Sequence, residues 1–223
     1  MNGLPLASFA IAMPPGWVRL PAGQELRWQL QKQIETIVSE ALPASLPRDR
    51  TEPWRGEIRK RLTRAVLDAE EAGATAVYLP AHPVNGVVIP ASFIESEVED
   101  DGRGTPVELI SDIVGDAESN ATRCVIDGAS GARIDRTITK AQPKGDWPEI
   151  STRQIVYTIE VPHREGRWIV LSFSAIFGDN PSAELSEALV LLFDALMLTF
   201  RWTGVPGREN TDLETRLYEI ASR

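Results

Sequence analysis

The stretch QIVYTIEVPHREGRWIVLSFSAIFGDNPSAELSEALVLLFDALMLTF, residues 154–200, decides the fold of this chain. Apolar and polar side chains alternate along residues 154–161 and again along residues 168–177. Alternation with a period of two, on both sides of a turn that contains Gly166, predicts an antiparallel hairpin. The apolar run over residues 182–200 predicts a helix, and this helix carries more apolar surface than one packed face needs. A hairpin that leads into such a helix predicts a sheet with a helix packed against it.

Helical and strand patterns fill most of the remaining chain. Apolar side chains at three- and four-residue spacing predict helices over residues 24–42 and 51–72, the second with Pro53 in its first turn and Gly73 just past its end. The expected buried stripe of the second helix consists of Trp54, Ile58, Leu62, Ala65, Ala69 and Ala72. Further expected elements are strands over residues 8–13, 74–79, 86–93, 123–127 and 132–139, and short helices over residues 106–114 and 210–222.

The order of these elements predicts the fold class. Successive strands are joined by hairpins, and the helices come early and late in the chain, which argues against a doubly wound parallel sheet. We therefore expect an α+β fold in which helices flank an antiparallel β-sheet, an α/β/α sandwich. We expect a single domain over residues 1–223, with an enlarged helical segment at residues 24–72 and a C-terminal helix at residues 210–222.

The composition limits the classes of function. A net charge of −9 argues against general binding to nucleic acid or to anionic membranes. No stretch has the basic start and small-residue cleavage site of a signal peptide, and the apolar helix at residues 183–200 is too short to span a bilayer, so we expect a cytoplasmic protein. The single cysteine, Cys124, excludes an internal disulfide. Its place in a predicted strand favours a small buried hydrophobic side chain over a nucleophile.

Residues suited to catalysis are few. The two histidines, His82 and His163, both fall in predicted turns, where a polar ring faces water. The sequence GASG at residues 128–131 lacks the five-residue spacing of a nucleophile elbow and is better explained as a hairpin turn. The acidic tract at residues 95–101 is typical of a solvated strand edge, with a divalent cation as the alternative. We therefore predict no catalytic, cofactor-binding or metal-binding residue.

The strongest surface signal is a basic cluster on the second predicted helix. Five cationic side chains lie within ten residues there. A solvated face with ion pairs between residues four apart is the simpler explanation. The alternative is a surface for an acidic or phosphate-bearing partner. Trp147 lies in a loop rich in Pro and Gly, where a tryptophan that anchors the loop in the core is the simpler explanation and an exposed indole that contacts a partner is the alternative. The candidate partner-binding residues are Arg55, Arg59, Lys60, Arg64 and Trp147.

Several packing motifs resemble those of a known superfamily. They are FAIAMPPGW at residues 9–17, YTIEVP at 157–162, WIVLSFS at 168–174, LFDA at 192–195 and TFRW at 199–202. In their order they are similar to the PsbP-like superfamily, of the LpqN and Ran-binding import-factor type, and in particular to its cytoplasmic actinobacterial members. The resemblance implies an antiparallel sheet sandwiched by helices and a non-enzymatic role in binding other proteins. It carries over no site residue.

Three functions remain as hypotheses. We expect first a non-catalytic cytoplasmic protein-interaction domain, an adaptor or chaperone-like protein whose partner is another protein. The second hypothesis is a small-molecule or lipid-binding domain with a pocket between the sheet and the helix at residues 183–200. The third is an enzyme with an unrecognised site. Neither a nucleic-acid partner nor membrane insertion is expected, and the sequence leaves the oligomeric state open.

Overall fold

The computed structural model describes residues 8–41, 48–83, 86, 89–100, 104–114, 121–140, 150–177 and 183–203. Contacts divide the chain into a large unit, Met1–Pro14 with Val98–Arg223, and a small unit, Pro15–Glu97. Each unit has a hydrophobic cluster of its own. The described residues form four helices and antiparallel strands, so the predicted α+β class is confirmed. The single domain stays a prediction, and the helix expected at residues 210–222 lies outside the described residues.

The hairpin predicted from the opening stretch is the centre of the large unit. β7 (Ile150–Glu160) and β8 (Arg167–Phe177) pair antiparallel, as expected from their alternating side chains. β6 (Ala129–Lys140) pairs with the other edge of β7, and β5 (Thr122–Ile126) pairs with β6. The strand order in this unit is therefore β8-β7-β6-β5.

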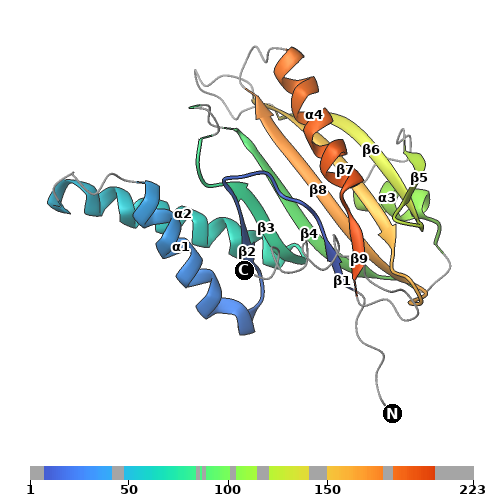
Figure 1. Cartoon of the computed structure of the whole chain (residues 1–223), viewed down its shortest axis with the longest axis horizontal. Coiled ribbons are helices and arrows are strands. Elements are labelled where there is room, and N and C mark those ends of the chain that lie inside the picture. Colours follow the sequence, from blue (N-terminus) through green and yellow to red (C-terminus); the bar gives the residue numbers. More distant parts are fainter. Residues whose placement is uncertain are drawn as a thin grey trace. The chain divides into compact units, whose positions relative to one another are not determined.

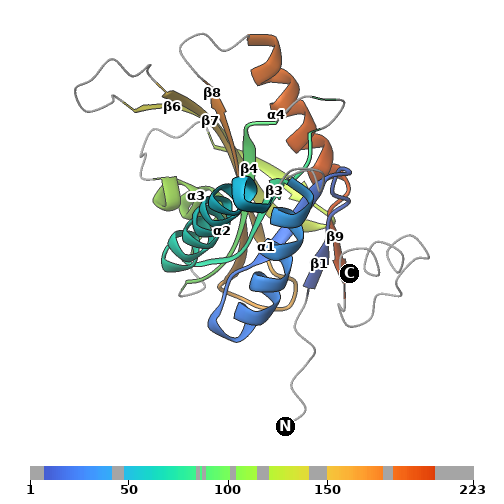
Figure 2. The ribbon, with the colours of Figure 1, turned by 90° about the vertical axis from the view of Figure 1, so that its left-hand side faces the viewer.

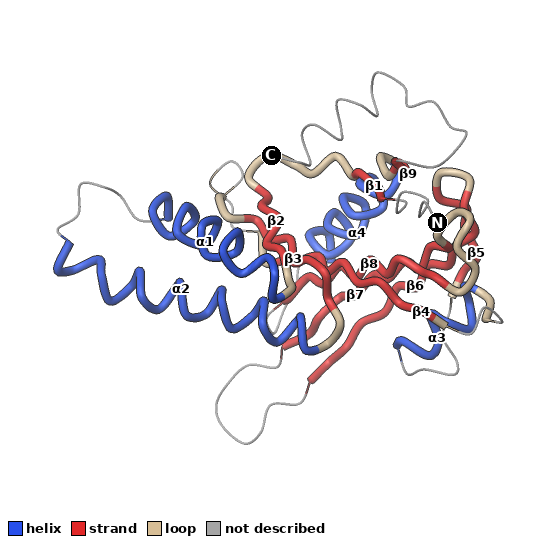
Figure 3. The backbone as a smooth tube through the Cα atoms, turned by 90° about the horizontal axis from the view of Figure 1, so that it is seen from below, coloured by secondary structure: helices blue, strands red, loops and turns tan. Residues whose placement is uncertain are grey.

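Helices cover both faces of this sheet, as Figure 3 shows. On one face α3 (Pro106–Val114) packs over β6 and β7. The cluster on that face consists of Ile110, Ala132, Ile134, Val156 and Val170. On the other face α4 (Ala183–Leu198) runs along β7 and β8 (Figure 1) and lays the ring of Phe193 on that of Phe173, with centroids 4.6 Å apart. The predicted α/β/α sandwich is confirmed for the large unit.

A two-stranded sheet joins the early and late parts of the large unit. β1 (Ser8–Ala10) pairs antiparallel with β9 (Arg201–Thr203), and the ring of Phe9 stacks on that of Phe200 at 5.0 Å. The strand expected over residues 8–13 therefore ends earlier. β9 escaped prediction because three residues are too few to show an alternating pattern.

The small unit packs a helical hairpin on a short antiparallel sheet. The strand order is β2-β3-β4, formed by β2 (Trp17–Pro21), β3 (Ala74–Pro80) and β4 (Ala91–Glu99). α1 (Arg27–Ala41) and α2 (Arg48–Glu71) lie side by side (Figure 2). The core between helices and strands consists of Leu20, Ala22, Leu30, Ile34, Ile37, Val38, Val66 and Val77.

The buried stripe of α2 differs from the prediction. Trp54 is 65% exposed and Ala65 is also exposed, whereas Val66 is fully buried and Thr51 is 3% exposed. Steps of four residues drift around a helix by about 40° each, because a turn takes 3.6 residues. A stripe that is extended toward the N-terminus in four-residue steps therefore leaves the packed face before it reaches Trp54. α2 also begins at Arg48, three residues before the predicted start, so Pro53 lies inside the helix and not in its first turn.

The backbone explains why two positions are occupied by glycine. Gly73 follows α2 with φ of 88°, a left-handed conformation that ends the helix as predicted. A Cβ at Gly131 would lie 2.7 Å from the carbonyl oxygen of Thr158 on the neighbouring strand. The GASG sequence therefore belongs to the β5–β6 hairpin, whose turn is at Asp127 and Gly128, and its second glycine permits close strand packing.

Candidate partner-binding groove

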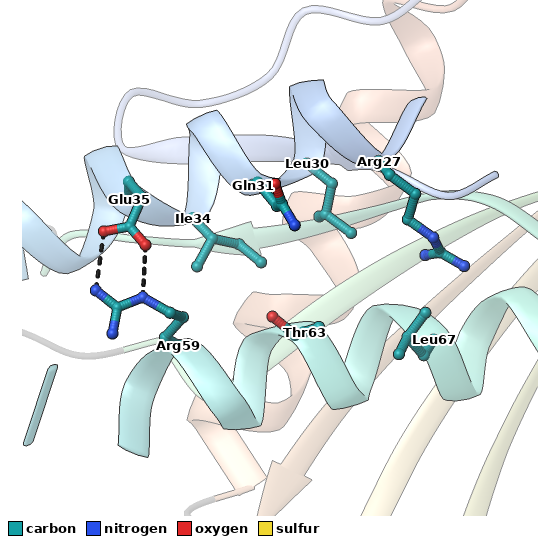
Figure 4. Close-up of a pocket in the computed structure, with 8 residues that line it drawn as sticks. All are labelled: Arg27, Leu30, Gln31, Ile34, Glu35, Arg59, Thr63 and Leu67. Carbon is teal, nitrogen blue, oxygen red and sulfur yellow. Dashed lines mark hydrogen bonds and ion pairs between the residues drawn. The ribbon is translucent and has the colours of Figure 1, made fainter. Parts of the chain in front are cut away.

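A groove runs between α1 and α2 in the small unit (Figure 4). Its volume is about 330 Å³. The apolar floor is formed by Leu30 and Ile34, which are 2% and 1% exposed, and by the half-buried Leu67. Gln31 from α1 and Thr63 from α2 line it above the floor. The same stripe that packs α1 into the core therefore also supplies the floor of the groove.

Ion pairs between the helices border the groove. Nε and Nη2 of Arg59 donate to the two carboxylate oxygens of Glu35, at 2.5 and 2.9 Å. Nη2 of Arg27 lies 2.8 Å from a carboxylate oxygen of Glu70. Both pairs join α1 to α2, so the groove is close to neutral overall, with a charged group of each sign near its walls.

The Arg27 border of the groove has an unused donor. Nη1 of Arg27 is buried, and among the described residues it finds no hydrogen-bond acceptor. In Figure 4 the guanidinium points across the groove toward Leu67. Because Nη1 is shielded from solvent, a partner would meet Arg27 through the accessible part of its side chain, which is 36% exposed. The groove thus offers an apolar floor with a polar contact beside it.

The Glu35–Arg59 ion pair predicts a shifted titration of the Glu35 carboxyl. Hydrogen bonds from Arg59 lower the pKa of the Glu35 carboxyl below its ordinary value. A lowered pKa in the folded state means that the pair stabilises the fold above the ordinary pKa and that this contribution is lost as the pH falls through the folded pKa. We expect NMR titration of the Glu35 carboxyl to give a depressed pKa that Arg59→Gln returns to the ordinary range. An unchanged pKa in Arg59→Gln would show that the pair does not persist in solution.

An exposed tryptophan lies on α1, about one helical turn from the groove lining. Trp28 is 63% exposed and lies three residues before Gln31, on the same side of the next turn of α1. Its neighbour Arg27 borders the groove. Tryptophan and arginine are the side chains most enriched among residues that dominate the binding energy of interfaces. α1 therefore carries, in the groove lining and next to it, two of the residue types that best anchor a protein partner.

The basic cluster is largely paired. Arg59 turns toward the groove and binds Glu35, while Arg64 pairs with Asp68 at 2.8 Å on the outer surface. Lys60 is exposed, and Arg55 is half-buried with a buried Nε that has no hydrogen-bond partner among the described residues. Of the five predicted residues only Arg59 lines the groove, and Trp147 lies outside the described residues. Arg27, Gln31, Glu35 and Thr63 escaped prediction because contacts between helices depend on their register, which no pattern within one helix shows.

A second polar cluster lies under α4 in the large unit. Nε and Nη2 of Arg133 donate to the carboxylate of Asp194, each at 3.0 Å. The hydroxyl of Tyr157 donates to the same carboxylate at 2.8 Å. Burial, together with the nearby Asp194 carboxylate, raises the pKa of Tyr157. The cluster joins α4 to β6 and β7, and its donors and acceptor satisfy one another, so it serves to hold the helix in place.

The residues considered for catalysis are dispersed. His163 is exposed in a turn, and His82 lies 3.1 Å from a carboxylate oxygen of Glu40. Cys124 is half-buried in β5, and burial raises the pKa of its thiol, so the thiol stays protonated at neutral pH. Within the described ranges no three His, Cys, Asp or Glu side chains gather as a metal site.

The acidic tract lies partly in β4, where two of its carboxylates have partners within their own units. Glu95 accepts hydrogen bonds from Thr75 at 3.0 Å and from Tyr78 at 2.8 Å, and it also pairs with Arg19. Glu99, farther along the strand, binds Arg167. These carboxylates therefore take part in ion pairs and hydrogen bonds of the sheet.

Across the described residues, no helix is both long enough and apolar enough to cross a bilayer.

Comparisons with known proteins show a distant likeness of fold. Neither protein-family models nor curated proteins match this chain. Among solved structures, the chain is similar to LpqN, described as involved in cell envelope biogenesis of Mycobacterium tuberculosis, with a TM-score of 0.41 and 12% sequence identity. The alignment covers 91% of this chain and 87% of LpqN. The two proteins thus share a distant relationship of fold.

Proposed function

We propose that this protein is a non-catalytic protein-interaction domain that binds a partner protein in the α1–α2 groove. The groove carries the proposal, because it is a hollow between two helices with mostly apolar walls, and its volume of about 330 Å³ is near the lower limit for small-molecule pockets. A site of this size suits one or two apolar side chains of another protein. Membership in the PsbP-like superfamily and a cytoplasmic location belong to the same proposal.

The chemistry of the groove suggests how the partner binds. An apolar side chain of the partner enters the groove beside the half-buried Leu67, while a backbone carbonyl or a carboxylate beside it contacts the Arg27 side chain, which is 36% exposed. Trp28, one helical turn from Gln31 on α1, extends the contact beyond the groove lining. The ion pairs of Arg27 and Arg59 stay in place, so binding requires no separation of charges.

Packing under α4 supports this choice over a ligand pocket between the sheet and that helix. The ring of Phe193 stacks on Phe173 at 4.6 Å and meets Tyr157 edge-on at 5.8 Å. The other buried side chains of the helix are Leu189, Val190, Leu196 and Met197. Aromatic and aliphatic side chains therefore fill the space in which the alternative places a lipid or small molecule.

Two tryptophans of nearly equal exposure provide the test. We expect affinity purification from the native host to recover a stoichiometric protein partner and Trp28→Ala to weaken its binding at least about thirtyfold, the effect of an interface hot spot. Trp54→Ala is the matched control, because Trp54 is 65% exposed but lies on α2 away from the groove lining. Binding by the control should be unchanged. Calorimetric titration with the recovered partner measures both affinities.

A second variant fills the groove without removing a contact at its rim. Thr63→Trp places an indole over the floor and is expected to abolish binding, whereas Arg64→Trp adds the same side chain on the outer surface of α2 and should leave binding intact. Equal affinities for all four variants and the original protein would place the binding surface elsewhere. A small molecule co-purified with a solitary chain would replace the proposal with a ligand-binding function.

A further inference from the structure

α4 is apolar on both of its faces. Its inner face packs on the sheet, as described above, yet Leu191 is 67% exposed and Leu198 is 78% exposed on the outer face. A helix that is hydrophobic all round is normally buried all round, and contiguous exposed apolar surface marks an interaction site. The outer face of α4 therefore has the composition of an interface.

The exposed residues form one straight row. Ala188, Leu191, Ala195 and Leu198 are separated by three, four and three residues, which places them along the side of the helix opposite Phe193. All four are exposed. We call this row the α4 stripe. Its spacing is the one that lets two helices pack their side chains together over a long contact.

The α4 stripe is complementary to itself when a second copy runs in the opposite direction. Consider a two-fold axis that crosses the outer face of α4 at the level of residue 193. It brings Leu191 against Ala195 of the second copy, because the two positions are equally far from residue 193. The same axis brings Leu198 against Ala188, for the same reason. Each large side chain thereby meets a small one in a single register, which is the condition for close packing of an isologous interface.

Charges at the two ends of α4 favour the same direction. Glu184 lies four residues before Ala188, in line with the stripe, and no basic residue lies in the last turn of the helix. Nη1 of Arg201 bonds the carbonyl oxygens of Leu198 and Phe200 and so lies at the C-terminal end. An antiparallel pair brings Glu184 of one copy beside Arg201 of the other. A parallel pair would instead place two Glu184 carboxylates together, which is unfavourable.

We propose that this protein forms a symmetric dimer through antiparallel pairing of the α4 stripes of two copies. The helix has 16 residues and is about 24 Å long, so the contact is smaller than a standard interface. The dimer is therefore expected to be weak and reversible. The stripe belongs to the large unit and the groove to the small unit, so the dimer does not depend on the proposed function.

Sedimentation velocity over a range of protein concentrations tests the dimer. We expect a concentration-dependent monomer–dimer equilibrium, and we expect Leu191→Glu with Leu198→Glu to raise the dissociation constant at least about a hundredfold. Circular dichroism should show the fold intact, because both leucines are exposed. Ile176→Glu is the control, since Ile176 is 52% exposed on β8 and lies outside the stripe. A monomer at every concentration, or a dimer that the paired glutamates leave unchanged, would overturn the proposal.

Disulfide trapping tests the direction and register. In a Cys124→Ser background, Leu191→Cys with Ala195→Cys places each new thiol opposite its counterpart of the other kind in the second copy. We expect this double variant to form a covalent dimer with two disulfides on mild oxidation, and Leu191→Cys alone to cross-link far more slowly. A parallel pair would align identical positions, so equally fast cross-linking by Leu191→Cys alone would contradict the antiparallel register.

Discussion

Phe193→Ala should lower the free energy of unfolding by about 3–5 kcal/mol, the usual cost of removing a buried aromatic ring. Phe193 is 1% exposed, stacks on Phe173 and meets Tyr157 edge-on. Its removal leaves a cavity at the centre of the contact between α4 and the sheet, which rigid strands cannot close. Urea unfolding followed by circular dichroism measures the change.

The control for Phe193→Ala is an apolar truncation on the surface of the same unit. Val125 is 73% exposed on β5, so Val125→Ala should change the free energy of unfolding by less than about 1 kcal/mol. Near-equal losses for the two variants would mean that α4 is not packed on the sheet through Phe193.

Asp194→Ala should produce the second largest loss in the free energy of unfolding, about 1–3 kcal/mol, because it removes the acceptor of Tyr157 and leaves Arg133 with a long ion pair to Asp135, at 3.6 Å. Arg133 loses a bidentate carboxylate, and Tyr157 loses the acceptor of its hydroxyl. The estimate stays modest because the Asp194 side chain is 34% exposed and water replaces part of the loss. Glu187→Ala is the control on the same helix. Glu187 is 62% exposed, and its ion pair with Arg153 is long, at 3.7 Å, so its loss should have little effect on stability.

A double-mutant cycle separates the network from its parts. Arg133→Met combined with Asp194→Ala should cost less than the sum of the two single changes, with a coupling energy of at least about 0.5 kcal/mol. Strict additivity would show that Arg133 and Asp194 do not interact in solution.

The alkaline range offers a further check on the same network. Because the pKa of Tyr157 is raised in the folded state, its stabilisation is present below the ordinary tyrosine pKa of about 10 and is lost as the pH rises above it. Tyr157→Phe should therefore reduce the loss of stability at alkaline pH. Tyr78 is raised in the same direction by burial and by Glu95, so it contributes an alkaline loss that this variant retains.

The elements of the fold were predictable where a pattern persisted over many residues. The β7–β8 hairpin followed from alternation, and α4 followed from a long apolar run. The start of α3 has a local cause, because the Thr105 hydroxyl accepts a hydrogen bond from the amide of Glu108. β9 did not follow, because three residues carry too little pattern. Trp54 was misplaced because a four-residue repeat drifts away from the packed face of a helix.

The candidate sites depended on contacts between elements. A basic cluster was visible along α2, but the sequence did not show that Arg59 meets Glu35 on α1, which leaves a groove beside the pair. The excess apolar surface of the helix at residues 182–200 was visible too. Only the packing showed that Phe193 faces the sheet while Leu191 and Leu198 stay exposed.

The sequence by itself determined most of the helices and strands and that the strands pair antiparallel, because backbone preferences and hydrophobic periodicity act over neighbouring residues. The tertiary structure decided which face of each helix is covered and which charges are paired. Those outcomes depend on the rotation and register of one element against another, and a rotation of about 40°, one four-residue step, moves a side chain away from the packed face of a helix.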